Sequence, residues 1–142
     1  MYEHNLDPIA FSFFGLKIYW YSLAYIFGFL FTYWYSKKLI RNKVLNLDLE
    51  IAEDFISIGI LAVILGGRIG YVFFYNFEYY LVNPIEIFKI WKGGMSFHGA
   101  LIGLVCHLVI FSHKNKQDII ELANLLAFSG PVGIFLGRIA NF

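Results

Sequence analysis

The chain has 142 residues, of which 59% are hydrophobic, 20% aromatic and 15% charged, and its mean hydropathy is +0.65. A soluble globular chain averages roughly 45–50% apolar and 25% charged residues, so this composition predicts a protein that lies in a lipid bilayer. The formal net charge of +1 gives no indication of a nucleic-acid partner, and none is expected. A single cysteine, Cys106, excludes a disulfide framework within the chain.

Four segments are apolar enough to be membrane spans, each of which needs about 20 residues to cross the hydrocarbon core. They run over residues 18–36, 54–76, 96–112 and 119–140. The first carries no charge and is crowded with tyrosine and tryptophan, a composition typical of interfacial belts. Pro131 lies in the middle of the fourth, where neighbouring helices can satisfy the carbonyl that a proline frees. The predicted fold is all-α, one polytopic membrane helix bundle over residues 1–142 with about four transmembrane helices.

Lysine and arginine are unevenly shared between the two sides of this bundle. The connections before the second and fourth spans carry six of them, and the connections on the opposite side carry three. The six are Lys37, Lys38, Arg41, Lys43, Lys114 and Lys116, and the three are Lys17, Lys89 and Lys92. The positive-inside rule then predicts a multi-pass protein with its N-terminus outside and both basic loops in the cytoplasm. In that orientation Arg68, His98 and Arg138 all lie towards the outer face.

Arginine inside a span is costly, roughly 2.5–3.5 kcal/mol at the centre of the bilayer, so it usually faces protein or a water-filled cavity. Arg68, Tyr71 and Tyr75 lie on one helical face, and so do Arg138 and Asn141. Both faces offer donors for anionic oxygen, and the arginine fork fits phosphate. We therefore favour a polar pocket for a phospholipid head group. Snorkelling of either arginine to the outer interface is the alternative.

The segment from Gly93 to Gly99 is typical of a helix start. Gly93 and Gly94 break the preceding segment, and Ser96 can cap the helix that follows. His98 would then lie at the positive end of the helix dipole, which disfavours imidazolium and keeps a neutral histidine available as a base. A histidine satisfied by a neighbouring carbonyl is the alternative. The preceding residues 83–92 are expected to form an interfacial helix or an outer loop packed on the bundle.

Three Gly-x-x-x-Gly pairs indicate close helix packing, because glycine lets membrane helices approach each other. The pairs are Gly66 with Gly70, Gly99 with Gly103, and Gly133 with Gly137. For Cys106 and its neighbour His107 we expect no metal or nucleophile role, since no further ligand lies at a useful spacing. No metal site and no cofactor are predicted.

Several motifs together resemble the bacterial prolipoprotein diacylglyceryl transferases. They are Leu65-Gly66-Gly67-Arg68-Ile69-Gly70-Tyr71, Gly93-Gly94-Met95-Ser96-Phe97-His98-Gly99, Gly137-Arg138-Ile139-Ala140-Asn141-Phe142, and Trp20-Tyr21 in the first span. The resemblance implies an enzyme of the bacterial plasma (inner) membrane with its active face towards the outer leaflet. Such an enzyme moves a diacylglyceryl group from phosphatidylglycerol to the lipobox cysteine in the signal peptide of a prolipoprotein, and glycerol phosphate leaves as the thioether forms.

The resemblance also implies roles for single residues. His98 would be the base, with Arg138 and Tyr21 as further catalytic residues; Arg138 and Asn141 would hold the phosphatidylglycerol head group, and Arg68, Tyr71 and Tyr75 would line the outer cavity. Ala100 and Ala140 stand where glycine is common in the family. The family signature continues past Asn-Phe with a further asparagine and a glutamate. Residues 1–142 are therefore expected to be the N-terminal part of a longer enzyme and to lack transferase activity alone.

Two other functions fit part of the pattern. Intramembrane arginine and histidine beside glycine-rich breaks also mark transporter and channel pathways. That function predicts polar residues through the full depth of the spans, whereas here they gather near one face. A non-catalytic scaffold that assembles through its glycine pairs is the other alternative, and it leaves Arg68, His98 and Arg138 without a purpose.

Overall fold

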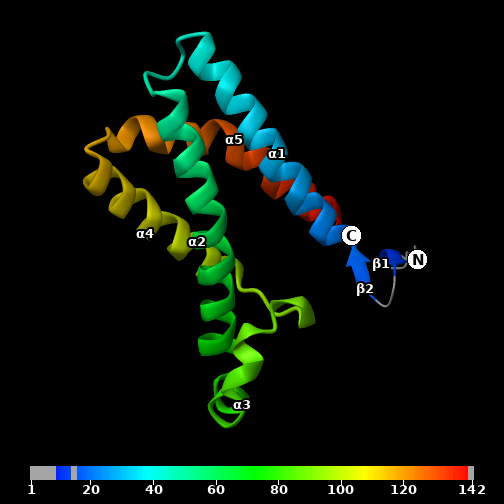
Figure 1. The fold of residues 1–142 in the computed structure, drawn as a ribbon. Coiled ribbons are helices and arrows are strands. Elements are labelled where there is room, and N and C mark those ends of the chain that lie inside the picture. The colour runs from blue at the N-terminus through cyan, green and yellow to red at the C-terminus, as the bar shows by residue number, and fades with distance from the viewer. Residues whose placement is uncertain (1–8, 14–15, 141–142) are drawn as a thin grey trace, which may run out of the picture. The chain divides into compact units, whose positions relative to one another are not determined.

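The fold is known from a computed structural model, which describes residues 9–13 and 16–140. In chain order these residues form β1 (Ile9–Phe13), β2 (Leu16–Tyr19), α1 (Trp20–Arg41), α2 (Leu49–Tyr75), α3 (Phe77–Val82), the 3₁₀ helices η1 (Pro84–Phe88) and η2 (Ile90–Lys92), α4 (Phe97–Asn115) and α5 (Ile119–Ala140) (Figure 1). The predicted all-α class is confirmed. The short antiparallel hairpin β1–β2, in which Ser12 lies opposite Lys17, was not predicted.

Each predicted span forms a helix, and the bounds differ in an instructive way. Helix α2 begins at Leu49, five residues before the predicted residue 54, because Glu50 and its acidic neighbours favour the positive end of a helix dipole. Helices α2, α4 and α5 are long and apolar enough to cross a membrane. Helix α1 is not among them, since its many tyrosines and tryptophans are only weakly apolar. Membrane crossing by α1 therefore stays a prediction.

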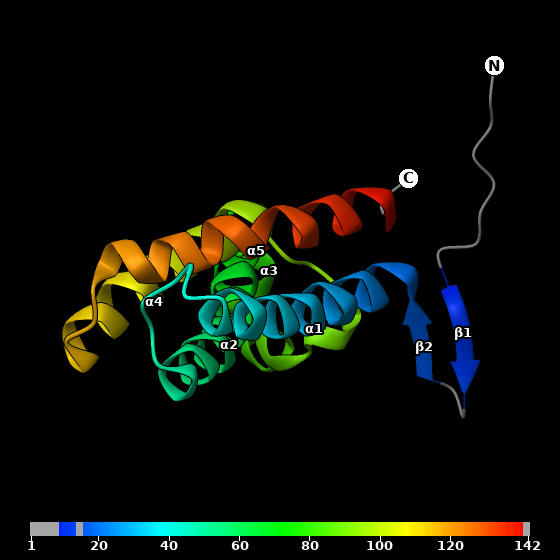
Figure 2. The same ribbon diagram turned by 90° about the horizontal axis from the view of Figure 1, so that it is seen from above.

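The chain divides into two units, which are described separately. The first contains residues 1–49 and 123–142. Within it α1 and most of α5 run antiparallel and side by side (Figures 1 and 2). A Cβ atom on Gly28 would lie 3.1 Å from the Cα atom of Gly133, so these two glycines mark a close approach. Ser129 is buried nearby and donates its hydroxyl to the Leu125 carbonyl oxygen at 2.7 Å, which satisfies it within its own helix.

The second unit contains residues 50–122, and glycines bring its two long helices together. A Cβ atom on Gly66 would lie 2.5 Å from the Gly99 carbonyl oxygen, and one on Gly70 would lie 2.7 Å from the Gly99 Cα atom. On Gly103 it would lie 3.1 Å from the Gly66 Cα atom. Two of the three predicted glycine pairs are thus confirmed as a close approach of α2 and α4. In the third, a Cβ atom on Gly137 would meet nothing within 4 Å among the described residues.

An aromatic cluster packs the same two helices further along their length. His107 is buried, and its ring stacks on Phe55 with centroids 4.6 Å apart and meets Phe111 edge-on at 5.4 Å. Its Nε2 atom lies 2.9 Å from the Phe55 carbonyl oxygen, so an N–H at that position donates to it. Gly59 leaves room for the ring. His107 therefore has a structural role, while its neighbour Cys106 is exposed on the outside of α4.

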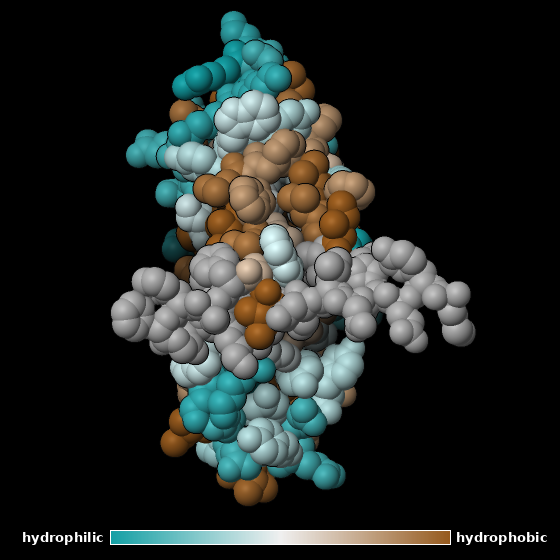
Figure 3. Space-filling view, turned by 90° about the vertical axis from the view of Figure 1, so that its right-hand side faces the viewer, coloured by the Kyte–Doolittle hydropathy of each residue, from teal (hydrophilic) through white to brown (hydrophobic). Residues whose placement is uncertain are grey.

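Large apolar side chains lie on the outside of both units. Phe27, Leu65, Phe74 and Ile110 are each about 60–70% exposed, and Figure 3 shows such apolar side chains at the surface. A water-soluble protein rarely exposes large continuous apolar patches. With three helices able to cross a membrane, this surface is that of a membrane protein whose helices face lipid.

Candidate functional site

The side chain of Arg68 organises the second unit. It is 4% exposed, and all five of its N–H groups donate to backbone carbonyl oxygens. The donor–acceptor distances are Nε to Ile87 2.8 Å, Nη1 to Gly93 2.7 Å and to Gly94 3.1 Å, and Nη2 to Glu86 2.6 Å and to Lys89 3.5 Å. The guanidinium thus has no N–H group left for a lipid phosphate in this arrangement.

The segment around Arg68 is shaped to present these carbonyls. Helices η1 and η2 are single short turns, in which the Glu86 and Lys89 carbonyl oxygens also accept from the Lys89 and Lys92 N–H groups at 3.2 and 3.1 Å. A carbonyl oxygen can accept two hydrogen bonds, so both remain able to receive the guanidinium. Gly93 and Gly94 follow with φ values of 82° and 84°, a left-handed conformation that glycine adopts without strain. The chain therefore curls around the guanidinium. Residues 84–92 thus form two short 3₁₀ helices held by Arg68, while Ile85, Phe88 and Trp91 are exposed. Whether this segment lies in the membrane interface stays a prediction.

The charge of Arg68 is balanced by dipoles and rings instead of a carboxylate. The guanidinium carbon lies 5.2 Å from the ring centroid of Tyr80 and 6.0 Å from that of Tyr71. The nearby Glu86 carboxylate instead accepts from Lys89 Nζ at 2.5 Å and from Lys92 Nζ at 2.7 Å. The hydrogen bonds from Lys89 and then Lys92 hold the pKa of the Glu86 carboxyl below its ordinary value, and Glu86 raises the pKa of Lys92.

The predicted face of Arg68, Tyr71 and Tyr75 is partly assembled. The rings of Tyr71 and Tyr75 stack at 5.5 Å with their planes 14° apart. Tyr71 also accepts a hydrogen bond at its hydroxyl from Asn76 Nδ2 at 3.2 Å, and its ring lies where a Cβ atom on Gly94 would be. Tyr71 thus packs on the loop, whereas Tyr75 is 63% exposed and open to a ligand or to lipid.

The start of α4 follows the prediction closely. Ser96 has extended backbone angles and accepts at its hydroxyl from the Gly99 N–H at 3.2 Å, which confirms it as the N-cap. Its own N–H donates to the Gly67 carbonyl oxygen at 2.8 Å and ties the start of α4 to α2. His98 is the second residue of α4 and is exposed, with Phe97 edge-on beside it. An exposed imidazole at this end of a helix is accessible to a substrate.

The other predicted site residues belong to the first unit. Arg138 lies in the last turn of α5, is exposed, and has no hydrogen-bond or ion-pair partner among the described residues. Tyr21 lies near the start of α1, but its side chain falls outside the description. Asn141 lies outside the described residues. The predicted meeting of His98 with Arg138 stays a prediction.

Two features of the site were missed from the sequence. Tyr80 is buried beside Arg68, and the backbone carbonyls of residues 86–94 receive the guanidinium. A tyrosine pair, Tyr79-Tyr80, in a short connection was a usable sign of the first, since a tyrosine ring face attracts a guanidinium. No side-chain sign exists for carbonyl acceptors. The described residues contain no group of three His, Cys, Asp or Glu side chains that could hold a metal ion.

Comparison with known proteins finds one family. The family model of prolipoprotein diacylglyceryl transferase matches residues 8–142. Proteins named phosphatidylglycerol–prolipoprotein diacylglyceryl transferase are similar: that of Ehrlichia canis is 53% identical over 96% of this chain and 52% of its own length. Those of Aeromonas salmonicida and Rickettsia typhi are each 44% identical over 97% of this chain and 50% and 53% of their own lengths. The chain thus spans about half the length of these curated relatives.

Proposed function

Because the chain belongs to the prolipoprotein diacylglyceryl transferase family, we propose that the protein transfers a diacylglyceryl group from phosphatidylglycerol to the lipobox cysteine of a prolipoprotein. The observation that carries this proposal is the exposed imidazole of His98. It lies in the first turn of α4, and the start of that helix is fixed by the Ser96 cap. A thiol needs help to ionise near neutral pH, because its pKa is about 8.5. An accessible imidazole can accept the thiol proton.

In the proposed reaction, His98 takes the proton of the lipobox thiol. The thiolate sulfur then forms a bond to the glyceryl carbon that carries the phosphate, and the bond between that carbon and the phosphate oxygen breaks. Glycerol phosphate departs with the electron pair. Arg138 stabilises the negative charge that grows on the departing phosphate, since its guanidinium is exposed and has no partner in the described residues. Asn141 and Tyr21 are proposed to complete the head-group site.

The contacts of Arg68 give it a different task from the one its sequence motif implies. With all five N–H groups on carbonyl oxygens, it holds the segment that leads into α4. We assign Arg68 the role of positioning His98, and not that of contacting the phosphate. Tyr71 packs on the same segment and Tyr75 is left to line the outer cavity.

Place and orientation are part of the proposal. The protein is proposed to be a multi-pass protein of the bacterial inner membrane. Its N-terminus lies outside, because six of the nine lysines and arginines counted in the connections lie in the two loops on the opposite, cytoplasmic side. His98 then faces the outer leaflet. Alkaline phosphatase, which is active only outside the cytoplasm, tests this: fusion after Gly93 should be active and fusion after Asn115 inactive. The reverse pattern would invert the topology.

A transfer assay on the protein expressed from its complete reading frame tests the chemistry. It measures movement of labelled diacylglyceryl from phosphatidylglycerol to a lipobox peptide. His98→Gln keeps the size of the side chain but cannot accept the proton, and we expect turnover to fall roughly 10²–10⁴-fold. His113→Gln is the matched control, because His113 is exposed near the other end of the same helix. Equal turnover in both variants would contradict the proposed role of His98 as the base.

A further inference from the structure

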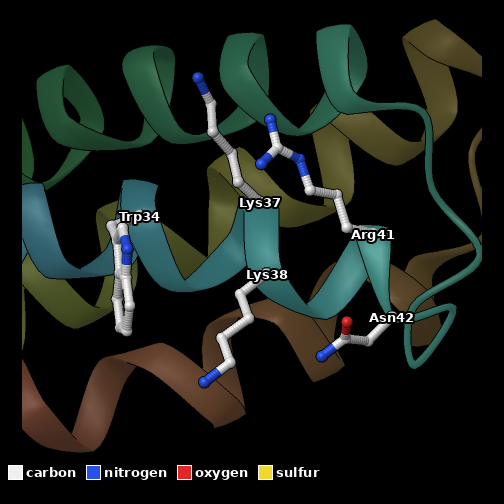
Figure 4. Close-up of a pocket in the computed structure, with 5 residues that line it drawn as sticks. All are labelled: Trp34, Lys37, Lys38, Arg41 and Asn42. Carbon is white, nitrogen blue, oxygen red and sulfur yellow. The ribbon is translucent and has the colours of Figure 1, made fainter.

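The last two turns of α1 carry a depression of about 240 Å³ that the proposed reaction does not use. It is lined by Trp34, Lys37, Lys38, Arg41 and Asn42 (Figure 4). The first four stand at positions i, i+3, i+4 and i+7, a spacing that places them around one face of a helix. Three of the lining side chains are cationic, one is an amide and none is acidic. Such a lining suits an anion.

Aromatic rings lie beneath two of these cations. Lys37 Nζ lies 4.2 Å from the ring centroid of Tyr33, and Lys38 Nζ lies 5.5 Å from that of Trp34. A ring face attracts an ammonium group and restricts where it points. Figure 4 shows Lys37 and Arg41 extending to one side of α1 and Lys38 to the other, so that the cations flank the depression.

These cations are not needed to cap the end of α1. Lys43, with φ 56°, reverses the chain after the helix. The Val44 N–H donates to the Leu39 carbonyl oxygen and the Lys43 N–H to the Ile40 carbonyl oxygen, both at 2.9 Å. This is the Schellman arrangement, which satisfies final helical carbonyls with backbone donors alone. The cationic side chains also favour the negative end of the helix dipole, but their N–H groups are not required there.

An apolar stripe leads along α1 to the depression. Phe27, Leu30 and Trp34 are 61%, 59% and 57% exposed, and their spacing places them on the same face as Lys38. This stripe begins with apolar side chains, continues to a tryptophan and is followed by cations. The same order of chemistry is found along a lipid, from its acyl chains to its head group. Acyl chains would cover the stripe, and the tryptophan would lie at the level of the head groups.

The depression is distinct from the phosphate site proposed at Arg138. Helices α1 and α5 run antiparallel, and Gly28 lies opposite Gly133 (Figure 2). From this level Lys37 lies further along α1 in one direction, and Arg138 lies further along α5 in the other. At about 1.5 Å per residue, roughly 20 Å of helix length separates the two.

We infer that the end of α1 binds the phosphate-bearing head group of an anionic phospholipid, with its acyl chains along Phe27 and Leu30. Arg41 offers a two-pronged fork to phosphate oxygens, and Lys37 and Lys38 add compact positive charges. A dissolved phosphate would use the cations but not the stripe. The proposed bound lipid is a structural lipid, not the substrate of the transfer reaction.

Native mass spectrometry of the complete protein released from mixed-lipid nanodiscs tests this. The nanodiscs contain phosphatidylcholine with a minority of phosphatidylserine, which is anionic and not the proposed substrate. The readout is retained phosphatidylserine relative to retained phosphatidylcholine. Lys37→Gln with Lys38→Gln should lower this ratio roughly tenfold or more, because each lysine near a membrane surface contributes about fivefold to the binding of anionic lipid. Lys37→Arg with Lys38→Arg should preserve it.

The matched control is Lys114→Gln with Lys116→Gln, which removes two lysines from another loop that does not line this depression. It should lower the ratio less than the Lys37 and Lys38 pair does, because these two lysines do not line the depression. Equal losses in the two double variants would overturn the proposal, since surface charge alone would then explain retention. Full displacement of phosphatidylserine by inorganic phosphate would overturn the lipid assignment. If the glutamine pair fails to fold, Arg41→Gln carries the same test with an expected loss of about fivefold.

Discussion

Arg68 and Arg138 stand in nearly the same local sequence, Gly67-Arg68-Ile69-Gly70 and Gly137-Arg138-Ile139-Ala140, yet their surroundings are opposite. Arg68 is 4% exposed and donates all five N–H groups to carbonyl oxygens of its own chain. Arg138 is exposed, and nothing in the described residues accepts a hydrogen bond from it. The guanidinium of Arg68 is fully hydrogen-bonded within the protein, whereas that of Arg138 is available for a ligand.

What separates the two arginines is the segment downstream of the first. The carbonyls that hold Arg68 belong to residues 86–94, which lie 18–26 positions further along the chain. A guanidinium that is saturated with backbone acceptors gains geometric precision but has nothing left for a substrate. We therefore expect changes at Arg138 to affect chemistry, and changes at Arg68 to affect the loop and, through it, the start of α4.

Of the two arginines, Arg138 should have the larger effect on chemistry, seen as the loss of transfer activity in Arg138→Gln. Removing one donor to a developing negative charge costs roughly 10²–10³-fold in turnover, and the thermal unfolding midpoint should stay within a few degrees of the wild type because Arg138 is exposed. Arg138→Lys keeps the charge but not the fork, so it should recover only part of the activity. Turnover and thermal unfolding are measured on the same preparation. Wild-type turnover in Arg138→Gln would remove Arg138 from the phosphate site.

Arg68→Met should act through stability. It removes the guanidinium from five carbonyl oxygens, of which only those of Glu86 and Lys89 are shown to keep a backbone donor, and the loss of a buried charged partner costs about 3 kcal/mol. Hydrogen exchange should rise across residues 84–96, including the Ser96 N–H that donates to Gly67. Arg68→Lys offers three N–H groups and no fork, so it should recover less than half of the lost protection. Exchange in Arg68→Met that matches the wild type would show that the loop does not depend on Arg68.

The fold could be predicted where the sequence pattern is local. Apolar length predicted the helices, Ser96 predicted its own cap, and the glycine spacing of α2 and α4 predicted their close approach. The hairpin β1–β2 could not, because its strands are short and hold no strict alternation. The environment of Arg68 could not either. Carbonyl oxygens occur at every residue, so no sequence pattern marks the ones that a distant side chain will use.

The glycine pairs extend the same contrast between the two parts of the chain. Gly66→Ala should destabilise the protein by about 1–3 kcal/mol, the usual range for overpacking, because its Cβ atom would lie 2.5 Å from the Gly99 carbonyl oxygen. Gly137→Ala is the matched control, since a Cβ atom there meets no described residue within 4 Å and alanine favours a helix. Denaturant unfolding measures both. Equal destabilisation would mean that helix contact does not explain the first pair.

The smallest expected effect concerns the lysines around Glu86, which lie at the surface of the loop that Arg68 holds. The pKa of the Glu86 carboxyl is lowered by hydrogen bonds from Lys89 and then Lys92. The contribution of the Glu86 carboxylate to the stability of the loop is therefore present above the carboxyl's ordinary pKa, about 4.3. It is lost as the pH falls through the lowered pKa. The pKa of Lys92 is raised by Glu86, so its contribution is present below about 10.4 and is lost as the pH rises through the raised value.

Hydrogen exchange of residues 84–94, corrected for the intrinsic pH dependence of exchange, should therefore show a plateau of protection between these limits and a loss on either side. In Glu86→Gln the acid limb should disappear, while the protection that depends on Arg68 persists, because Arg68 contacts the Glu86 carbonyl oxygen and not its carboxylate. An acid limb that survives in Glu86→Gln would assign it to another group. A loss of all protection in this variant would mean that the ion pairs, and not the buried guanidinium, hold the loop.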